Sequence, residues 1–249
     1  MKCIQKSFFI ILMLTFVACK PQKWQITQAT SNKIAIDASM QPLADSAYIS
    51  YLQPFKQKVD EKMNVVIGRT SQSMRAHAPE SLLSNLSADI YLQAASDYLK
   101  LPVDIAIVNL GGLRTQIPAG DITLRKVFEL MPFENELVIL WLRGDKLKNL
   151  LDYFASINGE GVAGLQMRID NGQATDILIG SENLDNQKLY CTATNDYLAD
   201  GNDNMEPLAA YEKRENTGIK IRDMFLDYIK NETAKGNLIQ SKLDGRIRN

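Results

Sequence analysis

VDIAIVNLGGLR, at residues 103–114, is the stretch that organises the rest of the chain. Its apolar, β-branched middle predicts a buried strand, which Asn109 ends. Gly111 and Gly112 then allow a sharp backbone turn. Arg114 follows with a guanidinium that can bind a phosphate or a carboxylate through two parallel hydrogen bonds. The residues alone therefore predict an anion site at the end of a strand, and an ordinary turn beside a surface arginine is the alternative.

Strand and helix patterns alternate on both sides of this stretch. Strands are expected at 33–37, 64–68, 105–108, 136–142, 164–169, 174–179 and 189–194, and helices at 44–63, 80–99, 124–130, 144–154 and 219–231. Pro54 predicts a kinked or two-part first helix, and the Asn171-Gly172 pair predicts a hairpin turn. Residues 69–79 and 195–204 are polar and are expected to be loops. The pattern predicts an α+β (mixed α/β) fold, a sandwich of helices on a mixed β-sheet.

The first residues have the pattern of an export signal. A positive start precedes a short apolar run that ends in Val17-Ala18-Cys19. This ending resembles the lipobox of bacterial lipoproteins, in which cleavage precedes a cysteine that becomes acylated. We expect a signal peptide at residues 1–18, a tether at 19–31 and one domain at 32–249, exported and lipid-anchored at Cys19 in the bacterial cell envelope. An ordinary signal peptide with a chance cysteine is the alternative.

Composition limits the classes of function. The formal net charge is −1 and the pI is about 5.9, so nothing favours binding to a nucleic-acid backbone. A mature chain of about 230 residues can bury a sizeable core. Cys191 lies in a strand-like run and is expected to be a small core residue. If Cys19 carries lipid, Cys191 has no partner within the mature chain and no disulfide is expected.

Several short motifs follow one another in a fixed order. They are SQSMR at 71–75, ESLLSNLSAD at 80–89, NLGGLR at 109–114, GDIT at 120–123, MPF at 131–133, LRG at 142–144 and TNDYLADGND at 194–203. Together they resemble the C-terminal domain of the 5′-nucleotidase family, which includes UDP-sugar hydrolases and ecto-5′-nucleotidase. The resemblance extends over about residues 34–229 and implies that domain's fold and a nucleotide or nucleoside ligand.

The resemblance assigns the phosphate end of the ligand to two arginines. Arg75 and Arg114 would hold the phosphate, and Asn109 would contact the ribose or the neighbouring backbone. Gly111 and Gly112 would shape the turn between them. From the residues alone, Arg75 is equally well explained as a solvated surface charge.

The same resemblance assigns the base and the sugar. Phe133 and Tyr197 would sandwich the base, and Asp203 would accept hydrogen bonds from the ribose hydroxyls. The alternatives are that Phe133 and Tyr197 are ordinary core residues and that Asp203 only shapes an Asx-turn. Where the family has Gly-Gly-Asp-Gly, this chain has Gly-Asn-Asp-Asn at 201–204. Asparagine tolerates positive φ better than most residues, so this loop can keep the same conformation.

In this family, hydrolysis belongs to a separate N-terminal metallophosphatase domain whose site holds two metal ions. The chain contains one histidine, His77, and lacks the G-N-H-[DE] and D-x-H motifs of such a site. We therefore expect no catalytic residue, metal or other cofactor in this chain, and divalent metals in a partner phosphatase. The first interpretation is a detached specificity module that works with a separately encoded metallophosphatase. The others are a stand-alone nucleotide-scavenging lipoprotein and an enzyme with its own chemistry.

Overall fold

The structure is a computed structural model that describes residues 24–249. The chain divides into two units, residues 1–51 and 52–249. Cys19 and the expected signal peptide lie outside the described residues. In the first unit, residues 24–37 contain no regular secondary structure, so the strand expected at 33–37 is wrong. Ile34 and Ile36 are 79% and 91% exposed. A strand needs a paired neighbour and a buried face, and this segment has neither among the described residues.

A short 3₁₀-helix, η1 (Ala38–Leu43), follows and is capped by the Asp37 side chain. The next helix, α2 (Ser46–Met63), runs through Pro54 as one helix and not as two. Proline removes one backbone donor and leaves a carbonyl without its partner. No residue of α2 is buried, so water can bind that carbonyl.

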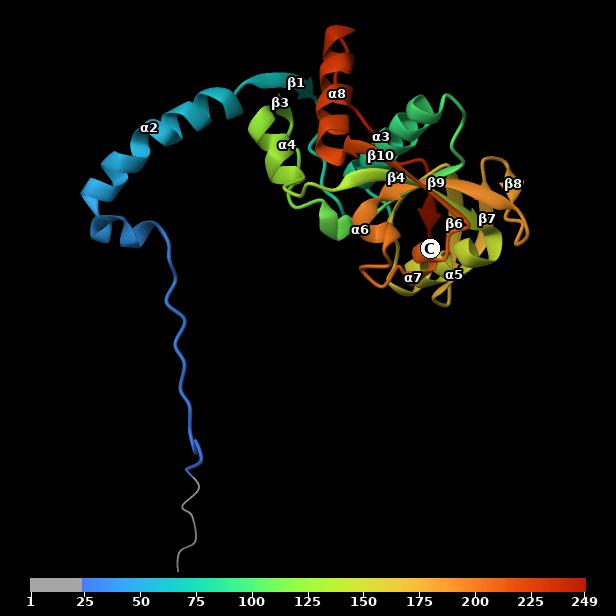
Figure 1. Ribbon diagram of the computed structural model, residues 1–249, viewed down its shortest axis with the longest axis horizontal. Helices are drawn as coiled ribbons and strands as arrows, with labels where there is room; N and C mark the ends of the chain where they lie inside the picture. Colours follow the sequence, from blue (N-terminus) through green and yellow to red (C-terminus); the bar gives the residue numbers. More distant parts are fainter. Residues whose placement is uncertain (1–23) are drawn as a thin grey trace, which may run out of the picture. The chain divides into compact units, whose positions relative to one another are not determined.

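A five-stranded mixed sheet forms the centre of the second unit (Figure 1). Its order is β10 (Lys213–Lys220), β4 (Glu136–Arg143), β9 (Leu189–Asn195), β2 (Ile105–Val108) and β5 (Gly161–Ala163). Only β2 and β9 run parallel to each other, and the other neighbours are antiparallel. All four residues of β2 are buried, as the apolar run predicts. The expected mixed α/β fold is confirmed.

Two layers of side chains cover this sheet. On one face, α3 (Leu82–Leu99), α4 (Leu124–Leu130) and α8 (Ile221–Ala234) pack against alternate strand residues such as Ala106 and Val108. On the other face, α5 (Gly144–Ser156) packs against Ile105 and Ile107. Figure 1 shows α3 and α8 on one side of β4 and β9, and α5 on the other. This alternation is the period-2 pattern of a strand that is buried on both faces.

Two smaller sheets complete the unit. One contains β11 (Ile247–Arg248), β6 (Leu165–Asp170), β7 (Gln173–Ile179) and β8 (Glu182–Asn183), and the other pairs β1 (Val66–Thr70) with β3 (Gly120–Thr123). The hairpin turn between β6 and β7 is confirmed, with φ of +50° at Asn171 and +75° at Gly172. Positive φ at both central positions is the geometry that an Asn-Gly turn favours.

Two expectations need correction. The segment 195–204 is not entirely loop, because α6 (Asp196–Ala199) begins there, with the Asn195 side chain accepting a hydrogen bond from the backbone N–H of Leu198. No strand was predicted at 213–220 either, where β10 forms the edge of the central sheet. Its polar sequence lacks an apolar face, and an edge strand does not need one on both sides. A further short helix is α7 (Glu206–Ala209).

Candidate functional site

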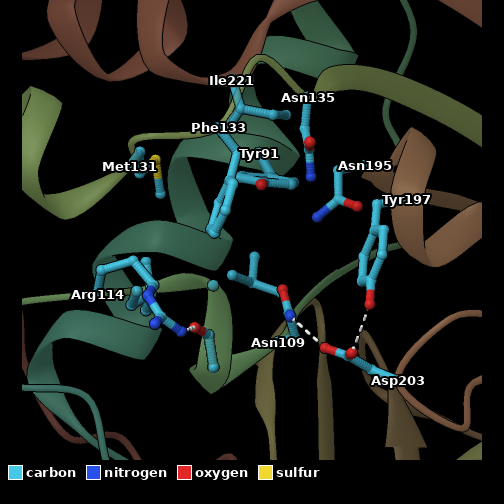
Figure 2. A pocket seen from close by; sticks show the side chains of 14 residues that line it. Tyr91, Asn109, Arg114, Met131, Phe133, Asn135, Asn195, Tyr197, Asp203 and Ile221 are labelled. Atoms are coloured by element: carbon cyan, nitrogen blue, oxygen red, sulfur yellow. Dashed lines mark hydrogen bonds between the residues drawn. The ribbon is translucent and has the colours of Figure 1, made fainter.

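A cavity of about 390 Å³ lies where β2 ends. Of the eight residues predicted to contact the substrate, seven line it: Asn109, Gly111, Gly112, Arg114, Phe133, Tyr197 and Asp203. Figure 2 shows side chains from several elements pointing into this space. The volume and the mixture of aromatic and polar walls are typical of a small-molecule site.

The turn at the floor of the cavity is a short 3₁₀-helix, η2 (Leu110–Gly112), directly after Asn109. Neither Gly111 nor Gly112 has a positive φ, so left-handed freedom is not why glycine fits here. A Cβ on Gly112 would lie 2.7 Å from Oδ1 of Asn109, whereas a Cβ on Gly111 would meet nothing within 4 Å. Position 112 thus favours glycine, because a Cβ there would displace the Asn109 side chain.

A carboxylate at the rim connects two sides of the cavity. Nδ2 of Asn109 donates to one oxygen of Asp203 at 2.6 Å, and the hydroxyl of Tyr197 donates to the other at 2.9 Å (Figure 2). This second hydrogen bond raises the pKa of Tyr197. A carboxylate has about four acceptor positions, so Asp203 can still accept hydrogen bonds from a ligand.

The two predicted aromatic rings lie on opposite sides of the cavity, with open space between them (Figure 2). Phe133 is 49% exposed and Tyr197 is 43% exposed, which is unusual for rings that serve only as core. The loop that carries Phe133 is held by Arg222, which donates to the carbonyl of Met131 and pairs with Glu134. The arrangement is a slot that is open to solvent and has an aromatic wall on each side.

Arg114 lies between this cavity and an adjoining polar one that Arg75 also lines. Backbone pairing of Met74 with Ile117 places Arg75 beside residues 114–116. Arg114 donates to the carbonyl of Gly111 at 3.1 Å, and its guanidinium carbon is 6.0 Å from the centroid of the Phe133 ring. In residues 24–249, neither arginine has an ion-pair partner. Arg75 is the one predicted substrate residue that lies outside the first cavity.

A partly buried carboxyl behind the turn was not predicted from the sequence. Glu160 accepts a hydrogen bond from the backbone N–H of Leu110 at 2.6 Å. Burial raises the pKa of Glu160 to about 7, against the effect of the backbone N–H groups of Leu110 and Gly161, and the nearby Asp203 raises it further. No local pattern marks this residue, because its partner is 50 positions away in the chain.

His77 does not belong to this site. It is exposed, and its backbone N–H donates to the Ser81 side chain at 3.1 Å. Across residues 24–249, no group of three or more His, Cys, Asp or Glu side chains is placed to hold a metal ion. No helix in the same part of the chain is both long and apolar enough to cross a membrane. Cys191 is buried in β9, as expected for a core residue.

Comparisons with known proteins identify the family of this chain. A family model described as 5′-nucleotidase, C-terminal domain, matches residues 66–210. A 5′-nucleotidase of Vibrio parahaemolyticus is 26% identical over 76% of this chain and 34% of its own length. The trifunctional nucleotide phosphoesterase protein YfkN of Bacillus subtilis is 30% identical over 79% of this chain and 15% of its own length.

Solved structures give the same result. The crystal structure of a 5′-nucleotidase precursor from Thermus thermophilus superposes with a TM-score of 0.69 at 28% identity, over 81% of this chain and 42% of that one. The chain spans about a third of the length of the curated 5′-nucleotidases that it matches. The family model matches more than half of the chain and the fold agrees with it, so this chain belongs to the 5′-nucleotidase C-terminal domain family.

Proposed function

We propose that the cavity at the end of β2 binds the nucleoside part of a nucleotide. The base would stack between Phe133 and Tyr197, and the ribose hydroxyls would donate to Asp203. One observation carries the proposal: two half-exposed rings lie on opposite sides of a cavity whose rim holds a carboxylate. Flat rings suit a base and an acceptor suits a diol.

The phosphate of the same ligand would lie beyond Arg114. Arg114 and Arg75 line the adjoining polar cavity and have no ion-pair partner among the described residues. Each guanidinium can donate two parallel hydrogen bonds to phosphate oxygens. Such donors hold the phosphate in the ground state as firmly as in the transition state, so they contribute to binding more than to rate.

In our proposal, this chain binds the nucleotide and a separately encoded metallophosphatase hydrolyses it. Two facts favour it: the match falls on the family's C-terminal domain, and the chain has a single histidine. The lipid anchor at Cys19, and with it a place in the cell envelope, is also part of the proposal.

Calorimetric titration of the purified chain with AMP, adenosine and UDP-glucose tests the binding. Phe133→Ala should weaken nucleoside binding about ten- to a hundredfold, because stacking on an aromatic ring is worth about 1–3 kcal/mol per base. Tyr98→Ala is the matched control: it removes a ring that is 40% exposed on α3, outside the cavity. Equal affinities of the Phe133→Ala variant and the unaltered chain would contradict the proposed slot.

Release of phosphate from AMP in the presence of Mn²⁺ tests the partnership. We expect release only when the chain is combined with a metallophosphatase from a neighbouring reading frame. Metal-dependent release by this chain alone, lost in Arg114→Ala, would instead make it an enzyme. Nucleoside binding without any effect on the phosphatase would favour the scavenging lipoprotein.

A further inference from the structure

The carboxylate of Asp203 depends on an unusual stretch of backbone. Asp203 has φ of +56° and Asn204 has φ of +58°, so two consecutive residues other than glycine are left-handed. This conformation brings Cβ close to the following carbonyl oxygen and disfavours residues that have a Cβ, although aspartate and asparagine tolerate it better than most. A pair of this kind keeps its shape only if surrounding contacts hold it.

Tyr153, on α5, makes such a contact with both residues. Its hydroxyl donates to the backbone carbonyl of Asp203 at 3.1 Å and accepts from Nδ2 of Asn204 at 3.5 Å. Its ring packs against the core on the α5 side of the sheet. The hydroxyl therefore reaches the loop from a fixed part of the protein, although Tyr153 does not itself line the cavity.

We propose that Tyr153 is a positioning residue for Asp203, an inference that rests on the proposed function. Asn109 and Tyr197 hold the carboxylate oxygens, and Tyr153 holds the backbone from which that carboxylate projects. With all three contacts in place, the free acceptor positions of Asp203 face the ligand in one orientation. Without the Tyr153 contact, the backbone of Asp203 and Asn204 relaxes, and the Asp203 carboxylate no longer points toward the ribose.

The variant Tyr153→Phe removes the hydroxyl and keeps the packed ring. Calorimetric titration should show affinity for adenosine falling about two- to tenfold, the range of one neutral hydrogen bond. Affinity for 2′,3′-dideoxyadenosine should not change, because that ligand lacks the 2′- and 3′-hydroxyls that would donate to Asp203. The control Tyr228→Phe removes a hydroxyl from α8, outside this cavity, and should alter neither affinity.

A second substitution separates positioning from general weakening of the fold. Glycine adopts positive φ without a Cβ penalty, so Asn204→Gly relieves the strain that Tyr153 helps to hold. Tyr153→Phe should therefore cost less adenosine affinity in the Asn204→Gly background than in the original chain. Non-additivity of this sign indicates coupling through the loop. Additive losses, or equal losses for adenosine and the dideoxynucleoside, would overturn the inference.

Hydrogen exchange gives a measurement that needs no ligand. Amides of residues 201–205 should exchange faster in Tyr153→Phe, while the central amides of α5 stay protected. If the unaltered chain binds no nucleoside, the proposed function fails. Hydrogen exchange alone then shows whether Tyr153 holds the loop at 201–205. If binding occurs but loop exchange and ribose preference are both unaffected by Tyr153→Phe, the positioning role fails and the proposed function stands.

Discussion

Replacing Gly112 by alanine tests whether the turn at the floor of the cavity holds Asn109 in contact with Asp203. The new Cβ would lie 2.7 Å from Oδ1 and 3.3 Å from Cγ of Asn109, closer than ordinary contact allows. The Asn109 amide must move, yet Asn109 is only 7% exposed and its Nδ2 is 2.6 Å from Asp203. A hydrogen bond to a charged group contributes about 1.5–3 kcal/mol. We expect Gly112→Ala to lower the free energy of unfolding by up to about that amount and to weaken adenosine binding about tenfold.

Gly111→Ala is the control from the neighbouring position. A Cβ there meets nothing within 4 Å, and the φ of Gly111 is not positive. Alanine at a compatible glycine position restricts the unfolded chain and stabilises by about 0.4–1 kcal/mol. Urea unfolding should therefore shift in opposite directions for the two variants, and calorimetry should show weaker adenosine binding only for Gly112→Ala.

A third variant identifies the cause. In the Asn109→Ala background, the new Cβ at position 112 has no amide to displace, so Gly112→Ala should add little further loss of affinity. If Gly112→Ala is as stable as Gly111→Ala, or if its effect persists without the Asn109 side chain, the proposed collision is wrong.

Substitutions at three further positions give separate tests. Tyr197→Ala should weaken nucleoside binding about ten- to a hundredfold by loss of stacking, whereas Tyr197→Phe keeps the ring and should lose about two- to tenfold through its missing hydrogen bond to Asp203; calorimetry would contradict this if both variants matched the unaltered chain. Burial raises the pKa of Glu160 to about 7, so its stabilising contribution is present at acidic pH and is lost as the pH rises through that value. Glu160→Gln, which keeps an acceptor for Leu110, should make urea unfolding less dependent on pH between about 5 and 8, and an unchanged dependence would assign it to other groups. Cys19→Ser should move the protein from the membrane fraction to the soluble fraction or block its processing, and unchanged fractionation would contradict lipidation.

Local patterns predicted the core of the fold well. The run that became β2 and the Asn171-Gly172 turn each have a cause within a few residues. The strand predicted at 33–37 failed because strand formation depends on a partner that the local sequence does not reveal. The same reason explains β10, whose polar residues pair at the edge of the sheet.

The candidate site was predictable as a set of residues but not as a set of contacts. Motif order brought Asn109, Phe133, Tyr197 and Asp203 together, and the structure places all four around one cavity. Tyrosine at 197 was expected only to provide an aromatic face, yet its hydroxyl also holds Asp203. Glu160 was not predicted either, since a carboxyl that binds a backbone N–H far along the chain has no sequence pattern.

Strand direction explains why these residues meet. Because β2 and β9 are parallel neighbours, their carboxyl ends lie at the same edge of the sheet, where Asn109 follows one and Tyr197 follows the other. The antiparallel strand β4 starts at that edge, where Leu137 pairs with Asn195, so Phe133 enters from the opposite chain direction. The side chains proposed to bind the ligand therefore belong to connections at one edge, while buried strand residues form the sheet that supports them. Substitutions in these connections can change what the cavity binds at little cost to the sheet, whereas substitutions in β2 act first on stability.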